Sequence, residues 1–206
     1  MTGSLADHAI MTLMSEAVRK LATWDDLEAL TGVPEGTNVE IVDGEFVFTP
    51  RSVAKSGRTQ GGLYHFVGGP FDFDPDGPGG WWIVIEPEVE LDRNRIVIPD
   101  LAGWRKDRLP RLPDSRPVRV RPDWVCEVLS PSTERLDRLW KANAYLRAGV
   151  PHYWLVGVPG RLLEALEAQG DRWVRVGAYS DGDVVRIPPF EAIELDVGRL
   201  FPPLTD

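Results

Sequence analysis

One segment of the chain restricts the fold more than any other. Residues 124–158 read, in order, as a short apolar strand, a long helix and a second apolar strand. The helix has clear ends, because Ser132 or Thr133 can cap its start and Gly149 followed by Pro151 stops it. Two apolar strands joined by a helix are typical of a parallel or mixed sheet with that helix on one face. The sequence therefore predicts an α/β fold.

Hairpins are predicted on both sides of this unit. The stretch 38–49 alternates around Asp43-Gly44, and two β-rich runs joined by Asp-Gly are a strong hairpin signal. A second Asp-Gly pair, at 181–182, predicts a closing hairpin. A chain of 206 residues suits one domain of this kind. We expect that domain over residues 21–206, preceded by an N-terminal arm over residues 1–20.

Composition and charge exclude several classes of protein. A single cysteine, Cys126, rules out an intramolecular disulfide framework and a four-cysteine zinc site within one chain. No apolar run approaches the ~18 residues of a membrane span, so we expect a cytoplasmic protein with no membrane partner. The formal net charge of −9 argues against a nonspecific DNA coat, because such binding depends on neutralising phosphates. It leaves open a nucleic-acid enzyme, since a carboxylate-rich active site adds negative charge of its own.

Two acidic residues in or beside strands are the candidates for chemistry. Asp100 ends the run 96–99, and Glu127 lies inside the apolar run 124–129. A carboxylate in a buried strand is costly unless it is paired or bound to a cation. Two of them on neighbouring strands would suit Mg²⁺, which is usually held by one or two carboxylates and several waters. With a lysine nearby to orient or deprotonate water, these residue types fit metal-assisted phosphodiester hydrolysis.

Each of these residues also has a plain structural interpretation. Pro-Asp occurs four times in the chain, so that dipeptide by itself does not single out Asp100. Glu127 could simply pair with an arginine such as Arg121. Lys141 lies four residues after Asp137, a spacing that favours a surface ion pair on a helix. At ~100° per residue it falls just beyond the buried arc of that helix, which is marked by Leu136, Leu139, Trp140 and Ala144.

Three segments carry a family resemblance. They are EIVDGEFVFTP at 40–50, IVIPDLAGW at 96–104 and WVCEVLSPSTERLDRLWKANAYLRAGVPHYWLV at 124–156. In these segments the chain resembles the Uma2-like endonucleases of the PD-(D/E)xK nuclease superfamily. The resemblance implies a restriction-endonuclease-like core, a central mixed β-sheet flanked by helices, with extra β-hairpins. It also implies a catalytic set in which the three acids bind Mg²⁺, or Mn²⁺ as a substitute: Glu45, Asp100, Glu127 and Lys141.

The chain departs from the family pattern at three places. In the superfamily's usual arrangement the lysine lies two residues after the second acid, where this chain has Leu129. The segment RSVAKSGRTQ after Pro50 lacks the usual Ser-Pro-x-His character. Gly157 stands where an aspartate commonly follows the Tyr-Trp strand.

We expect an Mg²⁺-dependent endonuclease that acts on DNA. The alternative is a catalytically silent, nuclease-like module that binds nucleic acid or protein, which the net charge favours slightly. A third interpretation is a homo-oligomeric domain whose eight tryptophans partly form subunit contacts. Any nucleic-acid contact is predicted to use an arginine-rich stretch, because arginine binds phosphate as a fork, although the stretch could equally be a solvated loop. Its candidates are Arg105, Arg108, Arg111, Arg119 and Arg121.

Overall fold

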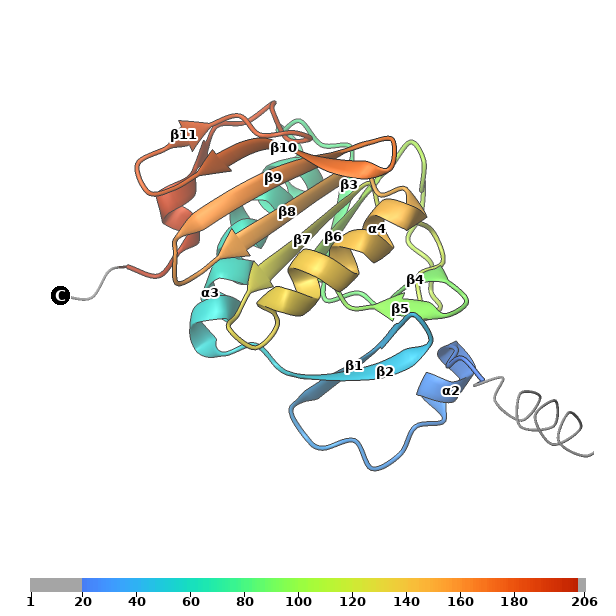
Figure 1. The fold of residues 1–206 in the computed structure, drawn as a ribbon. Coiled ribbons are helices and arrows are strands. Elements are labelled where there is room, and N and C mark those ends of the chain that lie inside the picture. The colour runs from blue at the N-terminus through green and yellow to red at the C-terminus, as the bar shows by residue number, and fades with distance from the viewer. Residues whose placement is uncertain (1–19, 204–206) are drawn as a thin grey trace, which may run out of the picture.

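The computed structural model describes residues 20–203, so the predicted arm over residues 1–20 lies outside the described part except for its last residue. The largest element is a six-stranded sheet with strand order β10-β9-β8-β7-β6-β3 (Figure 1). Strands β7 and β8 run parallel and the other neighbours run antiparallel, so the sheet is mixed. Its strands are β3 (Trp81–Ile85), β6 (Leu101–Arg105), β7 (Trp124–Leu129), β8 (His152–Gly157), β9 (Leu162–Gln169) and β10 (Arg172–Tyr179).

The parallel pair is the strand–helix–strand unit that the sequence predicts. Between β7 and β8 the chain forms η2 (Leu136–Lys141), a π-helical segment that continues directly into α4 (Ala142–Ala148). Gly149 ends α4 in the left-handed region, at φ +77°, which glycine adopts without a steric penalty.

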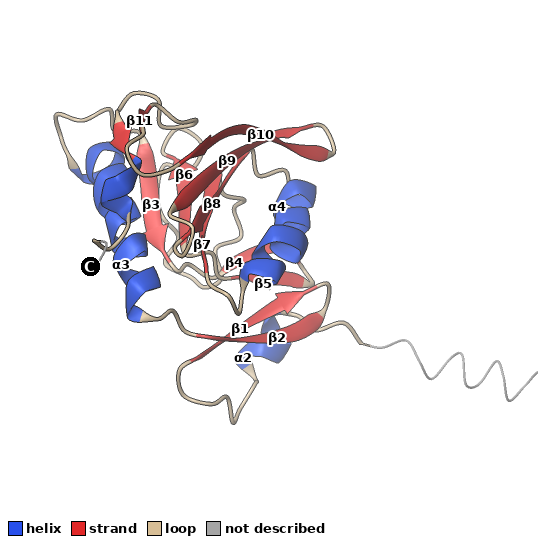
Figure 2. Ribbon diagram, turned by 60° about the vertical axis from the view of Figure 1, so that its left-hand side comes forward, coloured by secondary structure: helices blue, strands red, loops and turns tan. Residues whose placement is uncertain are grey.

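Helices cover both faces of the large sheet (Figure 2). One face carries α3 (Ala54–Leu63) and the π-helical η1 (Tyr64–Phe73), and the other carries η2 and α4. Strand alternation divides β7 between the two faces. Trp124 and Cys126 pack in the apolar cluster that includes Leu63 of α3, whereas Val125 packs with Tyr145 of α4. Glu127, two residues after Val125, therefore points toward the face covered by η2 and α4.

A second sheet, with order β2-β1-β5-β4, lies at one end of the large sheet (Figure 1). Its first two strands form the hairpin predicted around Asp43-Gly44, in which both turn residues have positive φ, +49° and +79°. The short helix α2 (Trp24–Glu28) packs against this hairpin. The strands are β1 (Thr37–Val42), β2 (Glu45–Pro50), β4 (Val89–Asp92) and β5 (Arg95–Val97).

The chain passes from the small sheet to the large one at Asp100. Strand β5 ends at Val97 and β6 begins at Leu101, so the three residues between them belong to neither sheet. Pro99 lies in this connection and has no N–H to donate to a ladder. Because Leu101 pairs with Cys126 of β7, Asp100 lies beside Glu127 at the junction of the two sheets.

The predicted closing hairpin around residues 181–182 is wrong. Strand β10 pairs instead with β9, through a turn in which Gly170 has φ +64°. The short strand β11 (Val184–Val185) pairs with β12 (Leu195–Asp196), before the 3₁₀ segment η3 (Val197–Leu200). The eight-residue strands of the β9–β10 pair form a longer ladder than the two residues of β11 could provide. Among residues 20–203, no helix is long and apolar enough to cross a membrane.

Candidate active site

A pocket opens where the two sheets meet, between the β1–β2 hairpin and the start of η2. The hairpin contributes the residues at its open end, and the loop after β7 contributes residues 130–133. Three of the four predicted catalytic residues also line this pocket: Asp100, Glu127 and Lys141. They come from the connection between the sheets, from β7 and from the last residue of η2.

Asp100 and Glu127 are held side by side by each other's backbone. The carboxylate Oδ2 of Asp100 accepts the N–H of Val128 at 2.7 Å. The carboxylate Oε2 of Glu127 accepts the N–H of Asp100 at 3.3 Å. Glu127 is buried, with 2% of its surface exposed, whereas Asp100 is only partly covered and faces the pocket.

Lys141 is buried at the centre of this cluster, with 5% of its side chain exposed. Its Nζ lies 2.9 Å from Oε1 of Glu40 and 3.1 Å from Oε1 of Glu127. It also donates to the carbonyl of Ile98 at 3.3 Å, and it lies 3.7 Å from Oδ1 of Asp137. The ion pair with Asp137 that the spacing predicts is therefore present, but it lies inside the protein.

The predicted position of Lys141 beyond the buried arc of its helix is wrong for a geometric reason. The arc assumes α-helical turns, whereas η2 is π-helical and places more residues in each turn. Leu139 and Trp140, which the arc assigns to the core, are 50% and 49% exposed. The wider turns thus rotate Lys141 and Asp137 into the protein.

The hairpin brings Glu40, not Glu45, into this cluster. Glu40 is 2% exposed, and its Oε1 accepts the N–H of Ile98 at 2.7 Å in addition to contacting Lys141. Glu45 is exposed and pairs with Val42 at the turn end of the hairpin, away from the open end that lines the pocket. The prediction that Glu45 converges with the other three residues is corrected accordingly.

Two further residues of the cluster are not predicted as functional from the sequence. Tyr145, buried on α4, donates its hydroxyl to Oε1 of Glu127 at 2.7 Å. Asp137 is also buried, whereas its spacing of four residues from Lys141 predicts only a surface ion pair. The sequence does contain a signal for Glu40. It lies on the same strand face as buried Val42, so that, like Glu127, it is a carboxylate within an apolar strand pattern.

Burial and mutual repulsion raise the pKa of three carboxyl groups in the cluster, those of Asp100, Glu127 and Asp137. Burial, and then the charge of Glu127, raises the pKa of Asp100 to about 8. Burial raises the pKa of Glu127 to about 7, against the opposing effect of Lys141, and raises the pKa of Asp137 to about 6. Burial by itself would lower the pKa of Lys141, but the charges of Glu127, Glu40 and Asp137 raise it well above its usual value. Lys141 is therefore protonated, and the carboxyl groups of the cluster outnumber this single cation.

The donor set fits a magnesium ion that keeps several waters. Within residues 20–203, no three His, Cys, Asp or Glu side chains are arranged to hold a metal by themselves. Mg²⁺ needs only one or two carboxylates in addition to water, and Asp100 and Glu127 supply two from adjacent backbone segments. Burial, which is the main cause of their raised pKa values, makes two charged carboxylates costly here unless a cation joins them.

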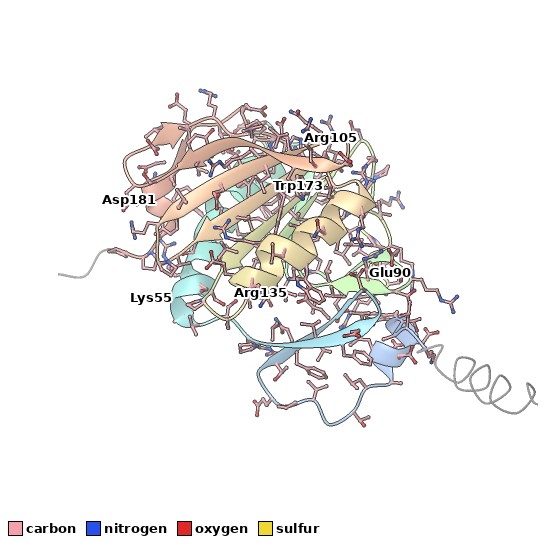
Figure 3. The ribbon with its side chains drawn as sticks, in the orientation of Figure 1. Lys55, Glu90, Arg105, Arg135, Trp173 and Asp181 are labelled. Carbon is pink, nitrogen blue, oxygen red and sulfur yellow. The ribbon has the colours of Figure 1, made fainter. Side chains whose placement is uncertain are left out.

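None of the five candidate arginines of the arginine-rich stretch lines this pocket. Arg105 and Asp100 are at opposite ends of β6, about 16 Å apart at ~3.3 Å per residue. Figure 3 shows Arg105 at the far end of the sheet from Lys55 and Arg135. Three of the five arginines are also paired with carboxylates: Arg105 with Asp107, Arg108 with Asp123, and Arg119 with Glu90. Arg121 donates to the carbonyl of Gly149.

A two-sheet α/β core with an acidic pocket and a buried lysine defines the restriction-endonuclease-like class of fold. The comparison with solved structures agrees: a crystal structure described as a "putative nuclease belonging to DUF820" from Anabaena variabilis ATCC 29413 superposes with a TM-score of 0.67. The match has 19% sequence identity and covers 87% of this chain and 97% of that one. The predicted fold is confirmed.

The chain belongs to the Uma2 family, which is described as "Putative restriction endonuclease" and whose family model covers residues 24–198. The family resemblance seen in the sequence is thereby confirmed. The search of curated proteins gave no match. The family model thus associates the chain with endonucleases, and the solved structure supports the fold.

Proposed function

We propose that this protein is a magnesium-dependent endonuclease that hydrolyses phosphodiester bonds in DNA. The observation that carries the proposal is the excess of acid in the pocket, where four carboxyl groups surround one lysine. These groups are Glu40, Asp100, Glu127 and Asp137. Such an arrangement is costly in a metal-free protein and becomes favourable when a divalent cation joins it. The family description supports nucleic acid as the substrate.

The chain's own residues would have distinct roles in this reaction. Asp100 and Glu127 would hold the ion, because they face the pocket from adjacent backbone segments. Bound Mg²⁺ supplies Lewis acidity toward a phosphoryl oxygen and lowers the pKa of water. Glu40 and Asp137 keep Lys141 protonated, so that its charge lies next to the place where a phosphate would bind.

Lys141 acts first as a positioning residue. Glu40, Glu127 and the carbonyl of Ile98 accept its three N–H groups, and Tyr145 holds Glu127 from the other side. These contacts fix the carboxylate of Glu127 before any substrate arrives. Lys141 would orient water only if one of these hydrogen bonds were exchanged, which substrate or metal binding could cause.

The test is a cleavage assay on the purified wild-type chain with supercoiled plasmid, linear duplex and single-stranded DNA. We expect nicking or cutting with Mg²⁺ or Mn²⁺ and none in EDTA. The matched control is Asp100→Asn purified in the same way, because it keeps the shape of the side chain and would report contaminating nucleases. Equal cleavage by both proteins, or no metal-dependent cleavage of any DNA form, would refute the proposal and favour a catalytically silent binding module.

A further inference from the structure

Three exposed cationic residues belong to, or directly adjoin, the chain segments that line the acidic pocket, and we call them the basic rim: Arg51, Lys55 and Arg135. Arg51 lines the pocket, and Lys55 follows pocket-lining Val53 on the first turn of α3. Arg135 lies between the pocket-lining residues Thr133 and Leu136. Figure 3 shows Lys55 and Arg135 at the same edge of the large sheet, the one next to the β1–β2 hairpin.

A second feature of the basic rim is its lack of partners, which it shares with other exposed arginines of the described residues 20–203, such as Arg93 and Arg172. Among the described residues, 20–203, none of its three side chains forms an ion pair or a hydrogen bond. By contrast, Arg138, one turn beyond Arg135, is paired with Glu134 and Glu164. An arginine that already holds a carboxylate must give it up to bind phosphate, whereas the rim cations can bind phosphate without such a loss.

The opposite side of the pocket has the reverse charge. Two further hollows share Asn38 and Ile98 with the pocket and continue it past the start of β4, and Arg51 of the basic rim also lines one of them. Arg116 on that side is paired with Glu88. The remaining charged residues that line only these two hollows are acidic: Glu28, Glu86 and Asp114. A polyanion would therefore be attracted to the side of α3 and η2 and repelled from the side of β4.

The loop between β7 and η2 adds neutral donors on the favourable side. The hydroxyl of Ser130 lies 2.9 Å from that of Ser132 and 3.0 Å from that of Thr133. All three residues line the pocket, and Ser132 is exposed. Hydroxyl groups of this kind donate to phosphate oxygens in protein–DNA contacts.

We infer that the basic rim grips the phosphate groups beside the scissile bond, so that the DNA strand runs from the pocket past the first residues of α3 and η2. This inference rests on the proposed nuclease function. The recognition is of the backbone, because none of the residues within 20–203 that line the pocket is aromatic, so none offers a ring on which a base could stack. The rim thus makes binding dependent on charge and independent of base sequence.

The test compares variants that remove equal charge from different places. The rim variant is Arg51→Ser/Arg135→Ser. The matched control is Arg93→Ser/Arg172→Ser, since both of these arginines are exposed and lie outside the three hollows. A third variant, Arg105→Ser/Arg119→Ser, tests the arginine-rich stretch. Binding to two fluorescein-labelled 20-bp duplexes of unrelated sequence is measured against salt concentration with Ca²⁺ present, and gels check that the DNA stays intact.

The rim variant should bind both duplexes more weakly and lower the slope of log affinity against log salt by about 2, roughly 1 for each phosphate that the variant no longer neutralises. The control should keep the wild-type slope. All variants should keep the thermal midpoint and calorimetric Mn²⁺ affinity of the wild type, because these side chains are exposed.

A wild-type slope in the rim variant, or a weakened slope appearing instead in Arg105→Ser/Arg119→Ser, would overturn the inference. If the wild type still cuts DNA in that case, the proposed function stands without it. If the wild type neither binds nor cuts DNA, the proposed function fails, and the inference fails with it.

Discussion

Replacing Lys141 by methionine should strongly destabilise the metal-free protein. Methionine fills a similar volume but removes the charge that faces Glu40, Glu127 and Asp137. The side chain is 5% exposed, so solvent screens these interactions very little. Removing one partner of a buried ion pair costs about 3–5 kcal/mol, because the remaining charge is left uncompensated. We expect a loss of that size at pH 8.

The loss should shrink as the pH falls. Burial raises the pKa of Glu127 to about 7 and that of Asp137 to about 6, and removing the lysine can only raise them further. Near pH 5.5 these groups take up protons, so that less unpaired charge remains in the core. The destabilisation at pH 5.5 should therefore be at least about 1 kcal/mol smaller than at pH 8.

Urea unfolding in EDTA at the two pH values measures both quantities. The matched control is Lys55→Met, which removes an exposed lysine that has no partner among residues 20–203 and should cost less than about 0.5 kcal/mol at either pH. A loss below about 1 kcal/mol at pH 8, or an equal loss at both pH values, would refute the electrostatic account of the cluster.

Three further predictions concern the same cluster. Because the folded-state pKa values of Asp100 and Glu127 are raised, the folded protein holds protons that the unfolded chain releases, and the thermal midpoint in EDTA should fall as pH rises from 6 to 8.5. A flat midpoint would contradict this. Mn²⁺ binding at pH 7 should release protons, and fewer at pH 8.5, as calorimetry in buffers of different ionisation enthalpy would show. Glu40→Gln should lower the cleavage rate at least about tenfold, whereas Glu45→Gln should change it less than about twofold. Equal effects of the two substitutions in the same plasmid assay would contradict the conclusion that Glu40, and not Glu45, belongs to the site.

The parts of the fold that could be predicted are those with local signals. The Asp43-Gly44 turn and the Gly149 helix end each need a backbone conformation that glycine supplies, and both lie where the sequence puts them. The closing hairpin was wrong because an Asp-Gly pair marks a turn without specifying which strands it joins. Pairing depends on the length of the available partners, and β9 offers β10 a longer partner than β11 does.

The site was predictable where a charge interrupts an apolar run. Asp100 and Glu127 meet this condition, and the structure brings them together. Lys141 was placed at the wrong depth because the π-helical turns of η2 have no signature in the spacing of its apolar residues. Glu45 was carried over from a family motif that also contains Glu40, and only the register of the hairpin separates the two acids.

The position of the lysine follows from the way the two sheets dock. Leu129, where the superfamily's usual pattern has lysine, is buried on the same face of β7 as Glu127. Lys141 reaches this space from the helix that covers that face, and it contacts Glu40 of the small sheet as well. One ammonium group therefore joins β1, the connection at Ile98 and β7. A lysine on β7 itself could form an ion pair with the acid on the same strand. Lys141 on the helix also contacts Glu40 of the β1–β2 hairpin, and so links the small sheet to the large one. The complete cluster therefore forms only when the two sheets have docked.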